Sequence, residues 1–283
     1  MREIHTITEL RDALAKERAA GKSVGFVPTM GALHDGHLAL IAKAREDCDL
    51  VVVSIFVNPA QFDRKTDLAS YPRDPESDSR IATDNGVNLL FCPSVEEMYP
   101  DHYYTYVFVE DLSAVLCGSV RPGHFRGVTT VVAKLLNIVR PDIAYFGEKD
   151  YQQLVIVKRM VQDLNMDADI VGVPTVRDPD GLAISSRNTL LNATEREDAT
   201  VIPRALFMAR DMAGRRGVAA SRIMERARMA IGEEPRVRIE YLNVVDPRTL
   251  RDVRQVDDKA LVALAAYVGE VRLIDNIMVG PGA

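Results

Sequence analysis

Two of the five histidines in this chain stand three positions apart, at 34 and 37, in the sequence His-Asp-Gly-His. They follow Ser23–Val27, an apolar run typical of a buried strand, and helical spacing begins directly after them at Leu38. The pair is therefore expected at the start of a helix, where free backbone N–H groups attract anions, phosphate above all. A single histidine at such a place is usually a cap or a surface residue, whereas a pair in this pattern favours phosphate chemistry.

Two later groups of residues also have the types that bind phosphate. Gly147–Asp150 follows a predicted strand and contains Lys149, whose ammonium is a compact positive charge. Ser185, Ser186 and Arg187 come later, and the arginine offers a planar fork of N–H donors. A lysine in a turn is more often only solvated, so Lys149 alone decides nothing. Neither G-x-G-x-x-G after a strand nor G-x-x-x-x-G-K-[ST] occurs, so a dehydrogenase or a P-loop kinase is not supported.

Predicted strands and helices alternate through the first part of the chain. Apolar runs predict strands at 23–27, 50–57, 87–92, 143–146 and 170–173. With helical patterns between them, they predict an α/β fold with a doubly wound, mostly parallel, Rossmann-like sheet and right-handed connections. Residues 58–75 contain three prolines and are expected to form a long loop at the carboxyl end of a strand, where such sheets bind ligands.

A polar stretch with Gly and Pro, residues 176–188, predicts a domain boundary. Residues 1–175 would form the Rossmann-like domain and residues 176–283 a smaller C-terminal α+β domain, because a long helix from Thr194 and a shorter one precede three strands. Within the first domain, residues 95–116 include the aromatic run YYTYVFV, which predicts an added or edge strand. That segment is the candidate contact of a homodimer. Packing within its own domain is an equally good interpretation.

Composition limits the class of protein. The formal charge of −6 and a pI near 5.5 argue against a nucleic-acid partner, so an anionic ligand must be held by local groups. Cys48, Cys92 and Cys117 form neither a zinc pattern nor a disulfide framework, which fits a reducing compartment. Without an apolar signal core at the start or a membrane-spanning run, the chain is expected to be cytoplasmic, with no membrane partner.

The stretch Pro28–His37, PTMGALHDGH, resembles the signature of the pantothenate synthetase family, within the His-x-Gly-His nucleotidylyltransferase superfamily. Further blocks match that family in order: Ser54–Phe62, Arg121–Phe125, Phe146–Leu154 and Ser185–Asn188. The match spans nearly the whole chain. His-x-Gly-His alone would indicate only the superfamily, whereas the blocks together specify the family.

The resemblance implies an ATP-dependent ligase of pantothenate biosynthesis that joins pantoate and β-alanine. The pantoate carboxylate attacks the α-phosphorus of ATP, pyrophosphate leaves, and the β-alanine amine attacks the pantoyl adenylate to give pantothenate and AMP. Negative charge develops on the phosphate oxygens, so fixed donors are the main catalytic resource. The resemblance assigns this catalysis to His34, His37, Lys149 and Arg187, with His37 as the proton donor.

The resemblance also implies an ATP site, with Mg²⁺ on the phosphates and no identified protein ligands for that ion. Its lining would be Met30, Gly31, Ala32, Leu33, His34, Asp35, Gly36, His37, Gly147, Glu148, Lys149, Asp150, Val176, Ile184, Ser185, Ser186 and Arg187. Ile184 stands where the family often has methionine, and its similar volume should preserve the contact. The first domain would bind ATP and pantoate, and the C-terminal domain would close over them as a lid.

Four residues are implied as substrate contacts: Asn58, Gln61, Arg121 and Gln153. Gln61 and Gln153 would contact pantoate, and Gln61 would also contact β-alanine. A carboxamide both donates and accepts hydrogen bonds, so one side chain can serve a carboxylate and then an amine. Most glutamines are surface amides without a ligand, so these roles depend on the resemblance.

Two alternatives remain open from the residues. The chain could be another adenylyltransferase of the superfamily, acting on a phosphorylated acceptor and releasing pyrophosphate without dependence on an amine. It could also be a nucleotide-binding regulator without turnover. The presence of both histidines with Lys149 and Arg187 weighs against the regulator, which needs no full catalytic set.

Overall fold

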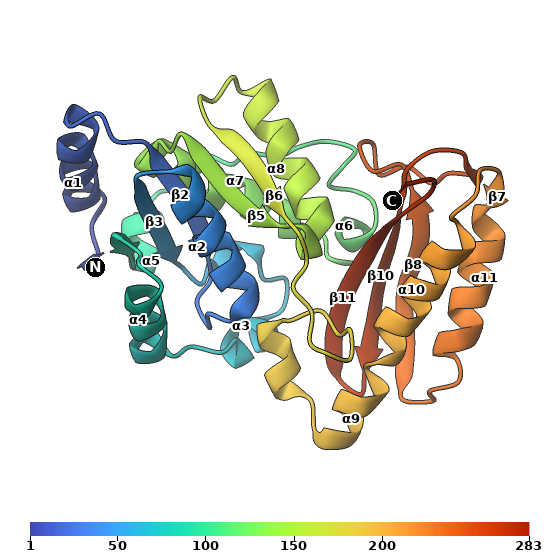
Figure 1. The fold of residues 1–283 in the computed structure, drawn as a ribbon. Coiled ribbons are helices and arrows are strands. Elements are labelled where there is room, and N and C mark those ends of the chain that lie inside the picture. Colours follow the sequence, from blue (N-terminus) through green and yellow to red (C-terminus); the bar gives the residue numbers. More distant parts are fainter. Residues whose placement is uncertain (283) are drawn as a thin grey trace. The chain divides into compact units, whose positions relative to one another are not determined.

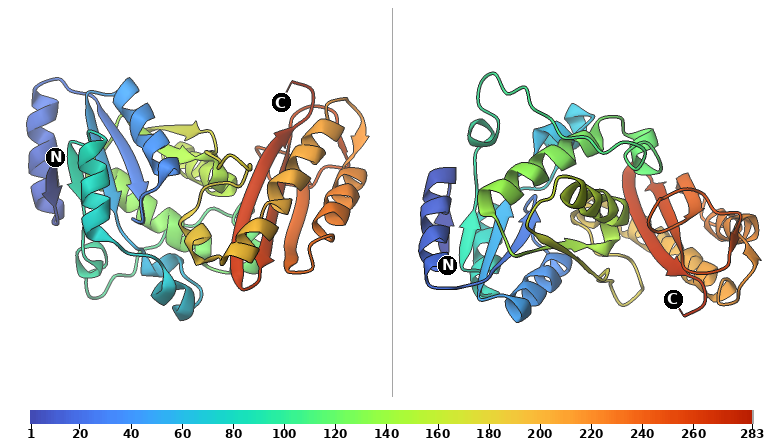
Figure 2. Two further views of the ribbon diagram at one scale, coloured as in Figure 1. Left: turned by 60° about the horizontal axis from the view of Figure 1, so that its bottom comes forward. Right: turned by 90° about the horizontal axis from the view of Figure 1, so that it is seen from above.

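The computed structural model describes residues 1–282, with Lys65 by its backbone alone. The chain forms two compact units (Figures 1 and 2). Unit 1 comprises Met1–Ser113, Val120–Glu148 and Gln153–Pro174, and unit 2 comprises Ala114–Ser119, Lys149–Gln152 and the chain from Thr175 onward. The single domain boundary near residue 175 stays a prediction. Within residues 1–282, every helix is too short or too polar to cross a membrane.

Unit 1 is built on a six-stranded sheet in the order β1-β4-β3-β2-β5-β6 (Figure 1). Its strands are β1 (Arg2–Ile4), β2 (Val24–Thr29), β3 (Leu50–Ile55), β4 (Leu89–Phe91), β5 (Ile143–Gly147) and β6 (Asp169–Val173). Every pairing is parallel. The central β3 is rich in β-branched residues because both of its faces are covered. The predicted doubly wound α/β fold is confirmed.

Helices cover both faces of this sheet. They are α1 (Ile7–Ala19), α2 (Asp35–Asp47), α3 (Lys65–Ser70), α4 (Pro75–Asp84), α5 (Val95–Met98), α7 (His124–Val139) and α8 (Tyr151–Asp163), with short 3₁₀ turns η1 (Pro59–Gln61) and η2 (Glu148–Asp150). On one face, Ile41 of α2 and Ala82 of α4 pack into a core with Val53 of β3. Helices α1 and α7 pack together on the opposite face (Figure 2). The alternation of faces follows from right-handed connections running both ways from β2.

Two segments of unit 1 differ from the prediction. Residues 58–75 are not a plain loop, because η1 and α3 lie within them. The predicted strand in the aromatic run is wrong, because that run has no sheet partner. The backbone of Val107 instead bonds to side chains of α7: its N–H donates to Thr130 Oγ1 at 3.1 Å, and its carbonyl accepts from Thr129 Oγ1 at 2.6 Å. The aromatic side chains are left exposed, Tyr104 by 80% and Phe108 by 55%.

Unit 2 contains a three-stranded antiparallel sheet in the order β11-β10-β8, covered on one face by helices (Figure 1). Its elements are α6 (Cys117–Val120, continuing into unit 1), η3 (Ser186–Leu190), α9 (Ala193–Asp198), α10 (Val201–Met212), β7 (Val218–Ala219), α11 (Ala220–Ile231), β8 (Val237–Val245), β9 (Gln255–Val256), β10 (Ala260–Val268) and β11 (Val271–Val279). The long helix expected from Thr194 is divided into α9 and α10. Pro203 explains the break, because it has no N–H to continue the helical bonding and is tolerated only in a first turn.

Strand β8 carries a bulge that changes which side chains share a face. Ala265 of β10 pairs with Tyr241 and Ala266 pairs with Ile239, so Glu240 is an extra residue in β8. Ile239 and Leu242 both pack into the core beneath the helices. The bulge therefore turns two successive residues, Glu240 and Tyr241, toward the other face of the sheet.

Candidate active site

Strand order in unit 1 identifies the edge of the sheet at which a ligand is expected. The chain proceeds outward from β2 through β3 and β4 in one direction, and through β5 and β6 in the other. Neighbouring strands β2 and β5 therefore form the topological switch point, beyond whose carboxyl ends open α/β sheets bind ligands. The His-Asp-Gly-His sequence follows β2, and η2 follows β5.

The loop after β2 is held by a buried carboxylate. The N–H groups of Ala32 and Leu33 donate to the two oxygens of Asp78, at 2.9 and 2.7 Å, and Asp78 is only 3% exposed. Gly31 has φ +80°, and a Cβ there would lie 2.8 Å from an Asp78 oxygen. Only glycine fits this turn. The sequence did not predict this role of Asp78, because an aspartate in the first turn of a helix is normally solvated.

His34 and His37 begin helix α2, as expected. His34 is the N-cap residue, and its backbone N–H donates to Nδ1 of His37 at 3.3 Å. The two rings lie 4.1 Å apart between centroids. Because Nδ1 of His37 is an acceptor, the neutral ring carries its proton on Nε2. The helix start thus fixes one ring N–H as a donor, which suits an anion that gains charge during a reaction.

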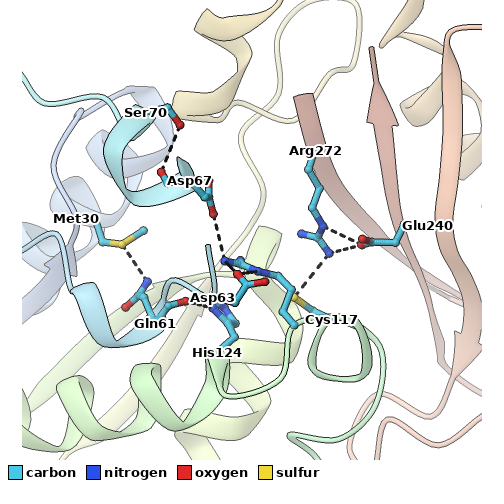
Figure 3. Close-up of polar contacts among 10 residues, drawn as sticks. Met30, Gln61, Asp63, Asp67, Ser70, Cys117, His124, Glu240 and Arg272 are labelled. Atoms are coloured by element: carbon cyan, nitrogen blue, oxygen red, sulfur yellow. Dashed lines mark hydrogen bonds and ion pairs between the residues drawn. The ribbon is translucent and has the colours of Figure 1, made fainter. Parts of the chain in front are cut away.

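Gln61 and Asn58 form a connected polar group in unit 1, and Figure 3 shows the contact of Gln61 with Met30. Gln61 is 8% exposed; its Nε2 donates to Met30 Sδ at 2.9 Å and its Oε1 accepts from Asn58 Nδ2 at 3.0 Å. Asn58 is 1% exposed, and its Oδ1 also accepts from Tyr99 OH at 2.9 Å. Asn58 lies behind Gln61 and orients its amide. The ring N–H of His124 donates to the Gln61 carbonyl at 2.8 Å and anchors η1 from α7.

Arg121 holds the segment that follows η1. Its guanidinium donates to Asp63 Oδ1 at 3.0 and 2.8 Å and to Asp67 Oδ2 at 3.2 Å. Burial would raise the pKa of Asp63, but the hydrogen bonds and charge of Arg121 outweigh it and hold that pKa below its usual range. The side chain of Gln153, half-buried on α8, makes no hydrogen bond within the described residues. Substrate contact by Arg121 and Gln153 stays a prediction.

In unit 2, three of the predicted ATP-site residues line one cavity: Lys149, Ser185 and Arg187. Ser185 caps η3, with its Oγ accepting from the Arg187 N–H at 3.3 Å. Ile184 is joined to Val176 by a backbone hydrogen bond of 3.0 Å. Gly147 ends β5 and Glu148 begins η2, and both residues belong to unit 1. The structure therefore groups Met30–His37 with Gln61 and Asn58 in one unit, and Lys149 with Ser185 and Arg187 in the other.

A parallel, doubly wound sheet with His-x-Gly-His at the helix start beside its switch point defines an α/β nucleotide-binding protein of the nucleotidylyltransferase type. The family model described as pantoate-beta-alanine ligase matches residues 2–278. The chain belongs to the pantoate–β-alanine ligase family.

Similarity to individual members covers almost all of the chain. The pantothenate synthetase of Heliobacterium modesticaldum is 52% identical over 281 residues, 99% of both chains. The crystal structure of pantothenate synthetase from Thermus thermophilus has a TM-score of 0.94 at 49% identity, covering 99% of this chain and 100% of that one. The pantoate-beta-alanine ligase of Francisella tularensis, complexed with beta-gamma ATP and beta-alanine, has a TM-score of 0.82 at 35% identity, covering 98% of this chain and 97% of that one.

Proposed function

We propose that this protein condenses pantoate with β-alanine at the expense of ATP, through a pantoyl adenylate, giving pantothenate, AMP and pyrophosphate. One observation carries the proposal: the paired histidines begin the helix after β2, at the switch point of the sheet, in a chain of this ligase family. Family membership favours this ligase over both alternatives left open by the residues. The Francisella relative, whose structure is complexed with beta-gamma ATP and beta-alanine, supports the same substrates here.

In the proposed reaction, the residues act mainly by position and charge. The Nε2–H of His37 donates to an oxygen of the α-phosphate, where charge develops as the pantoate carboxylate attacks. Lys149 and Arg187 act on the phosphates as a point charge and a planar fork. Gln61 offers its amide to the carboxylate of pantoate and then to the amine of β-alanine, held in orientation by Asn58.

Mg²⁺ would enter with the nucleotide. In the part of the chain that the structure describes, no three His, Cys, Asp or Glu side chains form a metal cage. Magnesium commonly keeps several waters and binds through substrate phosphates and one or two carboxylates. A site with few protein ligands therefore fits a magnesium ion that is delivered with ATP. Asp150, whose Oδ2 lies 3.8 Å from Lys149 Nζ, is the carboxylate we propose to approach it. The ion would neutralise charge on the phosphates.

The test is AMP formation from ATP and Mg²⁺ with both acids present, then with each omitted. The proposal predicts pantothenate and AMP in equal amounts, and little AMP without pantoate. With pantoate but no β-alanine, at most one equivalent of pyrophosphate per enzyme should appear. Steady pyrophosphate release without the amine would support a different adenylyltransferase, and no turnover would support a nucleotide-binding regulator.

We further propose a cytoplasmic homodimer. Three free thiols support a reducing compartment, and burial raises the pKa of Cys92 to about 12, so that thiol is unreactive at neutral pH. The exposed rings of Tyr104 and Phe108 support a partner surface. Sedimentation velocity should give a dimer for the native chain and a monomer for Tyr104→Ser/Phe108→Ser; a native monomer would contradict the dimer.

A further inference from the structure

The cavity in unit 2 has a lining with more positive than negative charge. Its residues are Lys149, Leu182, Ala183, Ser185, Arg187, Asn188, Ile202, Arg272, Leu273, Ile274 and Asp275. Asp275 is the one carboxylate among them, and it is 4% exposed and bound by Arg177 through hydrogen bonds of 2.6 and 2.9 Å. Its charge is therefore already balanced. Lys149, Arg187 and Arg272 place three cations around a small space, although Glu240 pairs with Arg272 and Asp150 lies 3.8 Å from Lys149. Several cations around one space suit a polyanion.

Arg272, on β11, is fixed in place by two neighbours (Figure 3). Its Nε donates to Glu240 Oε2 at 2.8 Å, and its Nη2 lies 2.6 Å from the same oxygen and 3.8 Å from Cys117 Sγ. The side chain is 13% exposed, so most of its water has been removed. Its Nη1 makes no hydrogen bond to any described residue. The two N–H groups on that nitrogen are therefore left for a ligand.

The bulge in β8 explains why this arginine is held so firmly. In a regular strand Glu240 would pair across β10, but as the extra residue it is turned toward the face where Arg272 lies. Burial alone would lower the pKa of Arg272; the hydrogen bond and charge of Glu240 overcome this and raise it. The guanidinium thus remains charged in a largely desolvated site, where charge-assisted hydrogen bonds are strong.

We propose that Arg272 binds the polyphosphate chain of ATP together with Lys149 and Arg187, and that Glu240 is its positioning residue. The inference rests on the proposed function for the identity of the anion. Arg272 lies 85 positions beyond Arg187, in a strand without a recognisable phosphate-binding motif. The sequence alone therefore does not indicate that Arg272 binds phosphate. Its guanidinium would favour pyrophosphate as a leaving group, since that product carries the same phosphates.

Arg272→Gln is the test, with Arg238→Gln as the matched control. Arg238 is an exposed arginine on β8 that packs over the Tyr267 ring and is absent from the cavity lining. We expect Arg272→Gln to raise the KM for ATP and the Kd for pyrophosphate at least about tenfold, with pantoate KM changed less than about twofold. Arg272→Lys should retain part of the pyrophosphate affinity, because it keeps the charge and loses the fork. Arg238→Gln should match wild type.

Glu240→Gln tests the positioning role. It should weaken pyrophosphate binding less than Arg272→Gln does, and the double variant should bind no more weakly than Arg272→Gln alone, because both act through one guanidinium. Additive losses would remove Glu240 from this role.

The binding measurement separates this inference from the proposed function. If Arg272→Gln, folded with a native melting temperature, binds pyrophosphate like wild type, the role of Arg272 is wrong even when the enzyme makes pantothenate. If wild type makes no AMP from pantoate and β-alanine, the proposed function fails, while a tenfold loss of pyrophosphate affinity in Arg272→Gln would still establish the anion site. An equal loss in Arg272→Gln and Arg238→Gln would also overturn the assignment, because it would reflect net charge alone.

Discussion

At the scale of single residues, the site depends on hydrogen bonds that determine which atom can donate. The backbone of His34 donates to Nδ1 of His37, which leaves the proton of the neutral ring on Nε2. Asn58 donates to Oε1 of Gln61, which leaves the amide N–H groups of Gln61 pointing elsewhere, one of them to Met30. In both cases a neighbouring polar group determines which atom remains a donor for the proposed substrates.

His37→Ala should slow adenylate formation by a factor of about 10² to 10⁴, the usual scale for a positioned acid or charge-stabilising donor. Rapid-quench measurement of a single turnover with saturating ATP and pantoate reports that step directly. His5→Ala, which removes an exposed histidine of the same unit, is the control. A normal single-turnover rate in folded His37→Ala would exclude His37 from the chemistry.

Gln61→Glu should separate the two half-reactions. The change keeps the acceptor that Asn58 uses, removes the donor and adds a negative charge, so pantoate binding should weaken by repulsion. We expect the pantoate KM to rise steeply. Transfer from preformed pantoyl adenylate to β-alanine should stay within about tenfold of wild type, or about 1.4 kcal/mol. Gln162→Glu adds the same charge at an exposed site of α8; equal losses in both half-reactions of Gln61→Glu would refute the divided role.

At the scale of elements, the position of Gln61 depends on how closely α7 approaches η1. The carbonyl of Gly127 in α7 accepts from Asn58 Nδ2 at 3.1 Å. A Cβ on Gly127 would meet the backbone of Ala60 and Gln61, which cannot move as a flexible side chain could. Glycine is therefore required here by packing, although its place inside a helix costs stability.

Gly127→Ala should force η1 away from α7 and disturb the amide of Gln61. The expected loss is about 1–3 kcal/mol of unfolding free energy, typical of overpacking, with a rise in the pantoate KM that exceeds any change in the ATP KM. Denaturant unfolding and steady-state kinetics measure the two effects. Gly214→Ala is the control, because its nearest neighbour would be an ordinary 3.6 Å away. Unchanged stability and pantoate KM would show that the contact can relax.

Elements with a clear apolar period were predictable, and elements defined by tertiary contacts were not. The runs at 50–57 and 143–146 became β3 and β5 because they are buried on both faces. In the aromatic run, the backbone of Val107 bonds to two threonines of α7 instead of to a strand, and no local sequence pattern shows such a contact. In the site, His34 and His37 were predictable from their place at a helix start. Asp78 and Arg272 were not, because each acts from a distant element.

At the scale of the whole molecule, stability should depend on carboxylates whose pKa is lowered in the folded state. These include Asp47, Asp49, Asp63, Asp180, Asp198 and Asp246. A carboxylate with a lowered folded pKa contributes stability above its unfolded pKa, near 4, and loses it as the pH falls through the folded value. Asp275 opposes the trend, because burial raises its pKa against the effect of Arg177.

The melting temperature should accordingly vary little between about pH 6 and 8 and fall steeply below about pH 4. Calorimetry or circular dichroism across this range measures it. Asp198→Asn, which removes the partner of Arg236, should lower the melting temperature at pH 7 and flatten the acid limb slightly. A melting temperature that stays constant down to pH 3 would contradict the expectation.

The proposed lid also belongs to this scale. Residues 176–188 carry Ser185–Arg187, so ATP that binds them should order the segment. Mg²⁺–ATP should slow tryptic cleavage after Arg187 at least about threefold, whereas GTP, as control, should have a smaller effect. Identical digestion with and without ATP would argue against closure.

The connectivity of unit 2 has a consequence for recombination between relatives. Its compact body includes Ala114–Ser119 and Lys149–Gln152, taken from the middle of the chain. Gln152 joins these segments, accepting from the Cys117 N–H at 3.0 Å and donating to the Val115 carbonyl at 2.7 Å, and Asn276 donates to the Lys149 carbonyl at 2.9 Å. A chimera made with one crossover near residue 175 would therefore inherit unit 2 from both parents. Unit 2 would come intact from one parent only if all of these segments were exchanged together.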